Sequence, residues 1–273
     1  MYLPSTLRRR LEARDARARA DGVREGLELA RARRARERHS YVFVVTFGRS
    51  GSTLVQGLLN TLPRTLVRGE NDLYLLHFYR GLAALRAFRE EHKAHGSYDD
   101  ASAFYGLKQI RRSAFMQAMN DVVTTGVLGG VEADDYDVVG FKEVTWHRIA
   151  PEETEDFFAV MDKAFPGVRY VLNTRDPDRA LASGFWRQED ESAARQKIAR
   201  TLDIQQHLRA TRPDRVLDVS YEQLTGDDDG VRDALLASLG AFVTGRPVDA
   251  SLMADLHTTL ARGFGPNPFG GTS

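Results

Sequence analysis

Cysteine is absent from the 273-residue sequence, and the 38 basic and 38 acidic residues leave no net charge. Without a thiol, the chain can form neither a disulfide framework nor a thiolate metal site. It has no apolar run of about 18 residues and no apolar signal-peptide core, so we expect no membrane span and a cytoplasmic location. A chain of this length suits one large α/β domain or two small ones.

The charges are unevenly placed along the chain. Residues 1–40 contain twelve arginines and six carboxylates, so this segment carries about +6 and the remainder about −6. Its Arg, Ala, Leu and Glu content predicts a long N-terminal helical arm, followed by a domain over residues 41–273. Interspersed carboxylates dilute the basic character, so we expect no nucleic-acid partner and favour a solvated arm or a homodimer through this helix.

Residues 41–53 read YVFVVTFGRSGST, an apolar run that ends in a loop of small and hydroxyl-bearing residues. The apolar residues that follow, beginning at Leu54, predict a helix. A strand, a tight loop and a helix in this order direct several backbone N–H groups at one point. The helix dipole adds to them, so the sequence predicts an anion-binding site in this loop.

The loop departs from the nucleotide-binding pattern G-x-x-x-x-G-K-[ST]. Ser52 and Thr53 follow Gly51 directly, so the usual lysine is missing and the cation lies before the glycine, at Arg49. Asp176 is the one plausible carboxylate for a nucleotide-bound metal, but the proline after it suggests a helix cap. A nucleotide kinase or NTPase with an altered loop is one alternative, and a non-catalytic nucleotide-binding scaffold is another.

A second informative stretch is YVLNTRDPDRALAS, residues 170–183. It predicts a strand that ends at Arg175 and a helix over residues 177–187, with Ser183 about two turns into the helix. A planar guanidinium and a hydroxyl donor together suit a phosphate dianion.

Strands and helices alternate along the rest of the domain. This order predicts an α/β, P-loop-like three-layer fold, with about five parallel strands covered by helices on both faces and the ligand beyond the carboxyl ends of the strands. Two of the expected helices cover residues 72–92 and 101–125. The first expected strand begins at Tyr41, and the other four cover residues 64–68, 137–144, 168–174 and 215–220.

The two phosphate elements resemble those of sulfotransferases that use PAPS (3′-phosphoadenosine 5′-phosphosulfate). Arg49-Ser50-Gly51-Ser52-Thr53-Leu54 is similar to the R-S-G-T-T-L loop of the tyrosylprotein group and its bacterial relatives. Arg175 and Ser183 have the spacing of the family's 3′-phosphate element, and the segment at Tyr221 is similar to its Y-E-x-L. The resemblance implies that Arg49, Ser50, Gly51, Ser52, Thr53, Arg175, Ser183 and Tyr221 bind PAPS, with PAP as the product and no metal.

The resemblance also suggests catalytic residues. Gly69-Glu70 is similar to the Gly-Glu pair that carries the family's catalytic glutamate, and Lys142 occupies the place of a lysine beside the transferring sulfuryl group. It implies in-line transfer to a hydroxyl of a sugar, lipid or natural-product acceptor, with Glu70 as base and Arg49 and Lys142 stabilising the leaving oxygen. His77 and His147 are competing bases. Trp146 and these histidines are candidates for the acceptor site, and the resemblance implies that the helices within residues 72–125 form an acceptor-binding insert.

Overall fold

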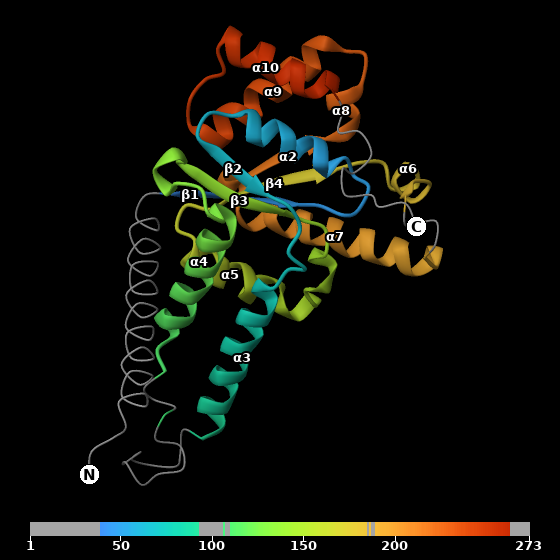
Figure 1. Cartoon of the computed structure of the whole chain (residues 1–273). Helices are drawn as coiled ribbons and strands as arrows, with labels where there is room; N and C mark the ends of the chain where they lie inside the picture. Colours follow the sequence, from blue (N-terminus) through green and yellow to red (C-terminus); the bar gives the residue numbers. More distant parts are fainter. Residues whose placement is uncertain (1–38, 93–105, 107–109, 185, 187–188, 263–273) are drawn as a thin grey trace, which may run out of the picture.

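A single parallel sheet forms the centre of the protein (Figure 1). The computed structural model describes residues 39–92, 106, 110–184, 186 and 189–262. All but the last two residues of the expected arm at residues 1–40, part of the expected helix at 101–125 and the tail after residue 262 therefore lie outside the described residues. The five strands lie in the order β2-β3-β1-β4-β5, which confirms the α/β prediction. They are β1 (Ser40–Val45), β2 (Thr65–Arg68), β3 (Val138–Glu143), β4 (Arg169–Thr174) and β5 (Val216–Ser220).

Strand β1 lies at the middle of the sheet and is apolar and buried from Tyr41 to Val45 because both of its faces are covered. Phe43 packs into the core on one face, while Val42 and Val44 pack into the core on the other. Its neighbour in β3, Gly140, pairs with Val42. A Cβ at Gly140 would lie 1.6 Å from the Val42 carbonyl oxygen, so only glycine fits this register.

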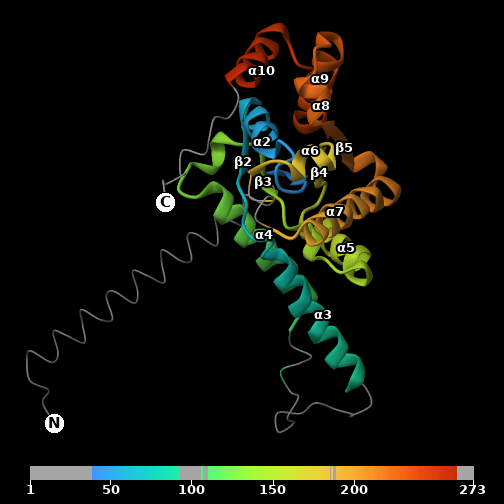
Figure 2. The same cartoon turned by 90° about the vertical axis from the view of Figure 1, so that its right-hand side faces the viewer.

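Helices cover both faces of the sheet, as Figures 1 and 2 show. The core against one face draws on helices α2, α9 and α10, and the core against the other on α3, α4, α5 and α7. The first set is α2 (Ser52–Thr61), α9 (Asp229–Thr244) and α10 (Ala250–Arg262), and the second is α3 (Leu75–Glu91), α4 (Arg112–Leu128), α5 (Thr154–Ala164) and α7 (Glu191–Thr211). Two short helices, α6 (Pro177–Leu181) and α8 (Tyr221–Thr225), follow the last two strands directly. Among the helices of the described residues, none combines the length and the apolar character needed to cross a bilayer.

The structure differs from the expected elements at three places. Helix α6 ends at Leu181 rather than near residue 187, and Ser183 lies in a bend beyond it because Gly184 has φ +66°, outside the helical region. Helix α4 continues three residues past the expected end, to Leu128. Helices α9 and α10 were not predicted, although they complete one layer of the core.

Candidate functional site

The residues expected to bind the donor or take part in catalysis lie along one edge of the sheet. Because the strands are parallel, their carboxyl ends meet at a single edge. The strand order places the segments after β2 and β3 at one end of that edge, the loop after β1 in the middle, and the segments after β4 and β5 at the other end. In this order along the edge lie Glu70 after β2, Lys142 one residue before the end of β3, Arg49 after β1, Arg175 after β4 and Tyr221 after β5.

The loop between β1 and α2 is held from beneath by side-chain hydrogen bonds. The Ser50 hydroxyl is fully buried and lies 2.6 Å from Thr46 Oγ1 and 2.9 Å from Asn173 Oδ1. Gly51 has φ +84° at the residue before α2, a conformation that favours glycine. Ser50 therefore ties the loop to β4 through its side chain. The helix N-terminus that follows is the expected anion-binding feature.

Arg175 and Tyr221 join the second expected phosphate element to this loop. Arg175 Nη1 donates a hydrogen bond to the Arg49 carbonyl oxygen at 2.9 Å, and the guanidinium carbon lies 4.4 Å from the centre of the Tyr221 ring. The same ring covers Gly51, where a Cβ would come within 2.1 Å of Tyr221 Cδ2. Arg175 Nε is buried and has no hydrogen-bond partner within the described part of the chain. One stacked assembly thus brings together residues from three separate segments.

Ser183 and Arg49 also touch. Arg49 Nε donates to Ser183 Oγ at 3.4 Å, and the Ser183 hydroxyl donates to the Ala180 carbonyl oxygen at 2.9 Å. Arg49 is exposed and has φ +66°, so its side chain reaches out of the loop toward the segment after α6. Ser183 therefore faces the loop from the bend after α6 and not from within a helix.

Glu70 and Lys142 form an ion pair at the other end of the sheet edge. Lys142 Nζ donates to Glu70 Oε1 at 2.5 Å, and the lysine side chain is 6% exposed whereas the glutamate side chain is 49% exposed. The nearby Arg68 of β2 donates from Nε to the Val127 carbonyl oxygen. The expected base and the expected cation are therefore direct neighbours.

Glu143 organises the backbone around this pair, and sequence reasoning did not identify it. Its carboxylate is fully buried. Oε2 accepts from the backbone N–H groups of Asn71 and Leu73, both at 3.0 Å. Oε1 accepts from the N–H groups of Val144 and Thr145 and from the Thr145 hydroxyl at 2.7–2.9 Å. This one carboxylate therefore fixes the segment after Glu70, where Leu73 has an unusual φ of +50°, against the segment after β3.

The candidate acceptor residues fall into different environments. His77 is exposed on α3, and His147 is half-buried. Trp146 is completely buried, and its indole Nε1 donates to the Val44 carbonyl oxygen at 3.1 Å. The short turn after β3 folds this indole beneath the sheet edge, where it packs against Phe141 and Phe158. Trp146 is thus a core residue, unlike the expected position at the acceptor site.

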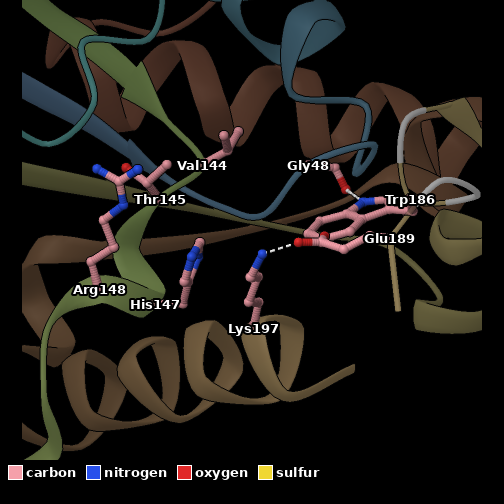
Figure 3. A pocket seen from close by; sticks show the side chains of 8 residues that line it. All are labelled: Gly48, Val144, Thr145, His147, Arg148, Trp186, Glu189 and Lys197. Carbon is pink, nitrogen blue, oxygen red and sulfur yellow. Dashed lines mark hydrogen bonds and ion pairs between the residues drawn. The ribbon is translucent and has the colours of Figure 1, made fainter. Parts of the chain in front are cut away.

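A cavity of about 380 Å³ opens beside the loop (Figure 3). Burial, followed by the charges of Lys197 and Arg148, lowers the pKa of His147 from its ordinary value. The Trp186 indole closes one end and donates from Nε1 to the Gly48 carbonyl oxygen at 2.9 Å. The residues that line the cavity are Gly48, Val144, Thr145, His147, Arg148, Trp186, Glu189 and Lys197.

Asp176 serves as a helix cap, as its sequence context predicts. Its Oδ1 accepts from Arg179 N at 3.0 Å, and this backbone hydrogen bond contributes most to lowering the pKa of Asp176. Glu222 braces the same turn by accepting from Asp176 N at 2.9 Å. Within the described residues, no group of three or more His, Asp or Glu side chains is arranged to hold a metal.

These features define a parallel α/β protein with a candidate anion-binding loop at the centre of its sheet edge and a second cationic element beside it. The sequence profile of the Sulfotransferase family matches residues 41–244, and the chain belongs to that family. No curated protein matches the sequence significantly. A solved sulfotransferase domain from the Synechococcus PCC 7002 olefin synthase is 15% identical to it, with 84% of this chain and 96% of that chain covered and a TM-score of 0.43.

Proposed function

We propose that the protein transfers a sulfuryl group from PAPS to a hydroxyl of a small-molecule acceptor and releases PAP. The observation that carries this proposal is the assembly of Arg175, Arg49, Tyr221 and Gly51. It joins a phosphate-type loop to a second guanidinium whose buried Nε lacks a hydrogen-bond partner among the described residues. A donor with phosphates at both its 5′ and 3′ positions needs two such elements at a fixed separation.

The order of residues along the sheet edge fits the order of groups in this donor. The 5′-phosphosulfate would lie on the backbone N–H groups of residues 50–53 at the start of α2. Arg175 and Ser183 would hold the 3′-phosphate, with Tyr221 against the nucleotide. The sulfuryl end would then face Lys142 and Glu70, because β3 and β2 lie on the opposite side of β1 from β4 and β5.

The proposed reaction is an in-line displacement at sulfur. The acceptor oxygen forms a bond to sulfur while the bond from sulfur to the 5′-phosphate oxygen breaks, and the acceptor proton passes to the Glu70 carboxylate. Lys142 and Arg49 would stabilise the negative charge that develops on the leaving oxygen. Lys142 must turn from Glu70 toward the donor for both roles to operate, so donor binding would release the base.

A comparison of PAP with adenosine 5′-phosphate by isothermal titration tests the donor site, because the two ligands differ only in the 3′-phosphate. We expect the wild-type protein to prefer PAP and Arg175→Ala to reduce that preference about tenfold or more, the usual scale for a lost charged hydrogen bond. Arg179→Ala, an exposed arginine four residues away, is the matched control.

An unchanged preference for PAP in Arg175→Ala would place the 3′-phosphate site elsewhere. Magnesium-dependent ATP binding that is indifferent to a 3′-phosphate would instead favour a nucleotide kinase or NTPase. PAP binding without any transfer from labelled PAPS would favour a non-catalytic scaffold.

A further inference from the structure

The cavity of about 380 Å³ is placed to receive an acceptor. Gly48, in its wall, immediately precedes Arg49 of the anion-binding loop, and Val144 lies two residues beyond Lys142. The cavity therefore opens beside the ends of β1 and β3, where the proposed donor would present its sulfuryl group. The inference below rests on the proposed function, because it concerns the acceptor of that reaction.

Basic side chains outnumber acidic ones in the cavity wall. His147 and Lys197 rise side by side from its lower wall, Arg148 lies at one end, and Glu189 lies at the other (Figure 3). Each of the three basic side chains offers N–H donors, whereas a carboxylate only accepts. A wall of this composition suits a ligand with a negatively charged, hydrogen-bond-accepting group.

Lys197 and Arg148 each form a partly exposed ion pair, which a bound anion can replace. Lys197 pairs with Glu189 at side-chain exposures of 35% and 30%, and Arg148 pairs with Asp72 at 45% and 70%. Ion pairs in such solvent-accessible positions typically contribute little stability. An ammonium has three donors and a guanidinium has five, so each cation can bind a ligand oxygen while its present pair is retained or loosened.

His147 responds to the charge in this cavity. Burial and the positive charges of Lys197 and Arg148 lower its pKa, while a hydrogen bond with the Val144 backbone and the charge of Glu189 act in the opposite direction. The imidazole is therefore neutral near pH 7. A bound anion would favour the protonated ring, so binding of an anion here should be coupled to proton uptake.

We propose that the acceptor is a hydroxylated carboxylate, whose carboxylate is held in this cavity by Lys197 and Arg148 beside His147. The carboxylate would anchor the acceptor at the wall opposite Gly48. Its hydroxyl would then be free to approach the sulfuryl group and Glu70. These two cations would thereby determine acceptor specificity without taking part in the chemical step.

Glycolate and glycolamide test this proposal, since they share a hydroxyl and a similar shape but differ in charge. Both are titrated into the full-length protein loaded with PAP, and binding is followed by NMR of the histidine ring nitrogens, with His147→Gln used to assign the signal. We expect glycolate to bind about tenfold or more tightly than glycolamide and to raise the pKa of His147. The preference should grow from about pH 8 to about pH 6, on either side of the ordinary histidine pKa.

Substitutions test whether the preference for glycolate over glycolamide depends on the cavity residues. Lys197→Gln and Arg148→Gln should each reduce the ratio of glycolate to glycolamide affinity several-fold, whereas Lys163→Gln, an exposed lysine on α5, should leave it unchanged. Equal affinities for the two ligands, no shift at His147 with glycolate, or a ratio that survives both cavity variants would each overturn the proposal. PAP affinity is measured in the same samples: if it is normal, only the acceptor inference fails, and if it is absent, the proposed function fails.

Discussion

Replacement of Glu70 by glutamine separates a catalytic role from a structural one. Glutamine has nearly the same shape, and its amide oxygen can still accept the hydrogen bond that Lys142 Nζ donates to Glu70 Oε1 at 2.5 Å. The amide cannot take a proton from an acceptor hydroxyl. Glu70→Gln therefore removes the proposed base while it keeps the geometry of the pair.

The two expected magnitudes are well separated. The Glu70 side chain is 49% exposed, so loss of the charge–charge interaction with Lys142 should lower the free energy of unfolding by about 1 kcal/mol or less. For a chain of this length, that corresponds to a shift in Tm of a few degrees. Loss of a positioned general base typically slows proton transfer and attack by about 10²- to 10⁴-fold, or about 3 to 5 kcal/mol.

A panel of hydroxylated compounds is first screened for an acceptor that the wild-type protein sulfates. The rate of single-turnover transfer from ³⁵S-labelled PAPS to that acceptor then measures the effect of the substitution. Thermal unfolding and PAP titration are run on the same samples, and Glu132→Gln, at an exposed position before Ala133, is the matched control. We expect Glu70→Gln to show near-normal PAP affinity and a transfer rate at least about 10²-fold lower. A rate within about tenfold of wild type would refute the assignment, and His147, which lines the cavity, would become the first candidate base.

Two further substitutions test how the site is held together. Gly51→Ala should weaken PAP binding about tenfold or more, because its Cβ would displace Tyr221 from Arg175, and its positive φ should cost about 1 to 2 kcal/mol in backbone strain. Gly126→Ala on α4, with open space around it, should preserve PAP affinity in the same titration. Glu143→Gln should lower the free energy of unfolding by about 2 kcal/mol or more, because an amide cannot accept all five hydrogen bonds. Urea unfolding measures this loss, and hydrogen exchange at the Asn71 and Leu73 amides should become faster. Wild-type values in both measurements would contradict the role given to this carboxylate.

The sequence was informative wherever a residue's role depends on its local chain. The loop after β1, the cap at Asp176 and the strand that ends before Arg175 are each set by neighbours in sequence. The structure has a loop that ends at Gly51, a cap and a strand end at these places, although α2 begins at Ser52 rather than at Leu54. Parallel strands then bring such segments to one edge by topology alone. The contact of Glu70 with Lys142 follows from the adjacency of β2 and β3, which the sequence did not specify.

Other parts of the site depend on contacts between distant segments and could not be read locally. In the sequence, Glu143 looks like any other glutamate at the end of a strand. Its role comes from the backbone after Glu70, where the N–H of Leu73, 70 residues away in sequence, donates to its carboxylate. Lys197 lines the cavity because α7 packs against the turn after β3. Trp146 looked like a pocket residue by its position after a strand, yet the direction of that turn buries it.

The position of Tyr221 couples the two proposed phosphate-binding elements. Its ring lies on Gly51 and under the Arg175 guanidinium, and Arg175 in turn binds the Arg49 carbonyl oxygen. Movement of either element must therefore disturb the other, because no rearrangement of Arg175 leaves both the stacking and the hydrogen bond intact. Binding of a 3′-phosphate at Arg175 would thus help to fix the loop that holds the 5′-phosphosulfate. A donor without the 3′-phosphate would lose both its contact with Arg175 and this ordering of the loop. The preference for PAPS over a donor that lacks the 3′-phosphate should therefore exceed the preference expected from one charged hydrogen bond alone.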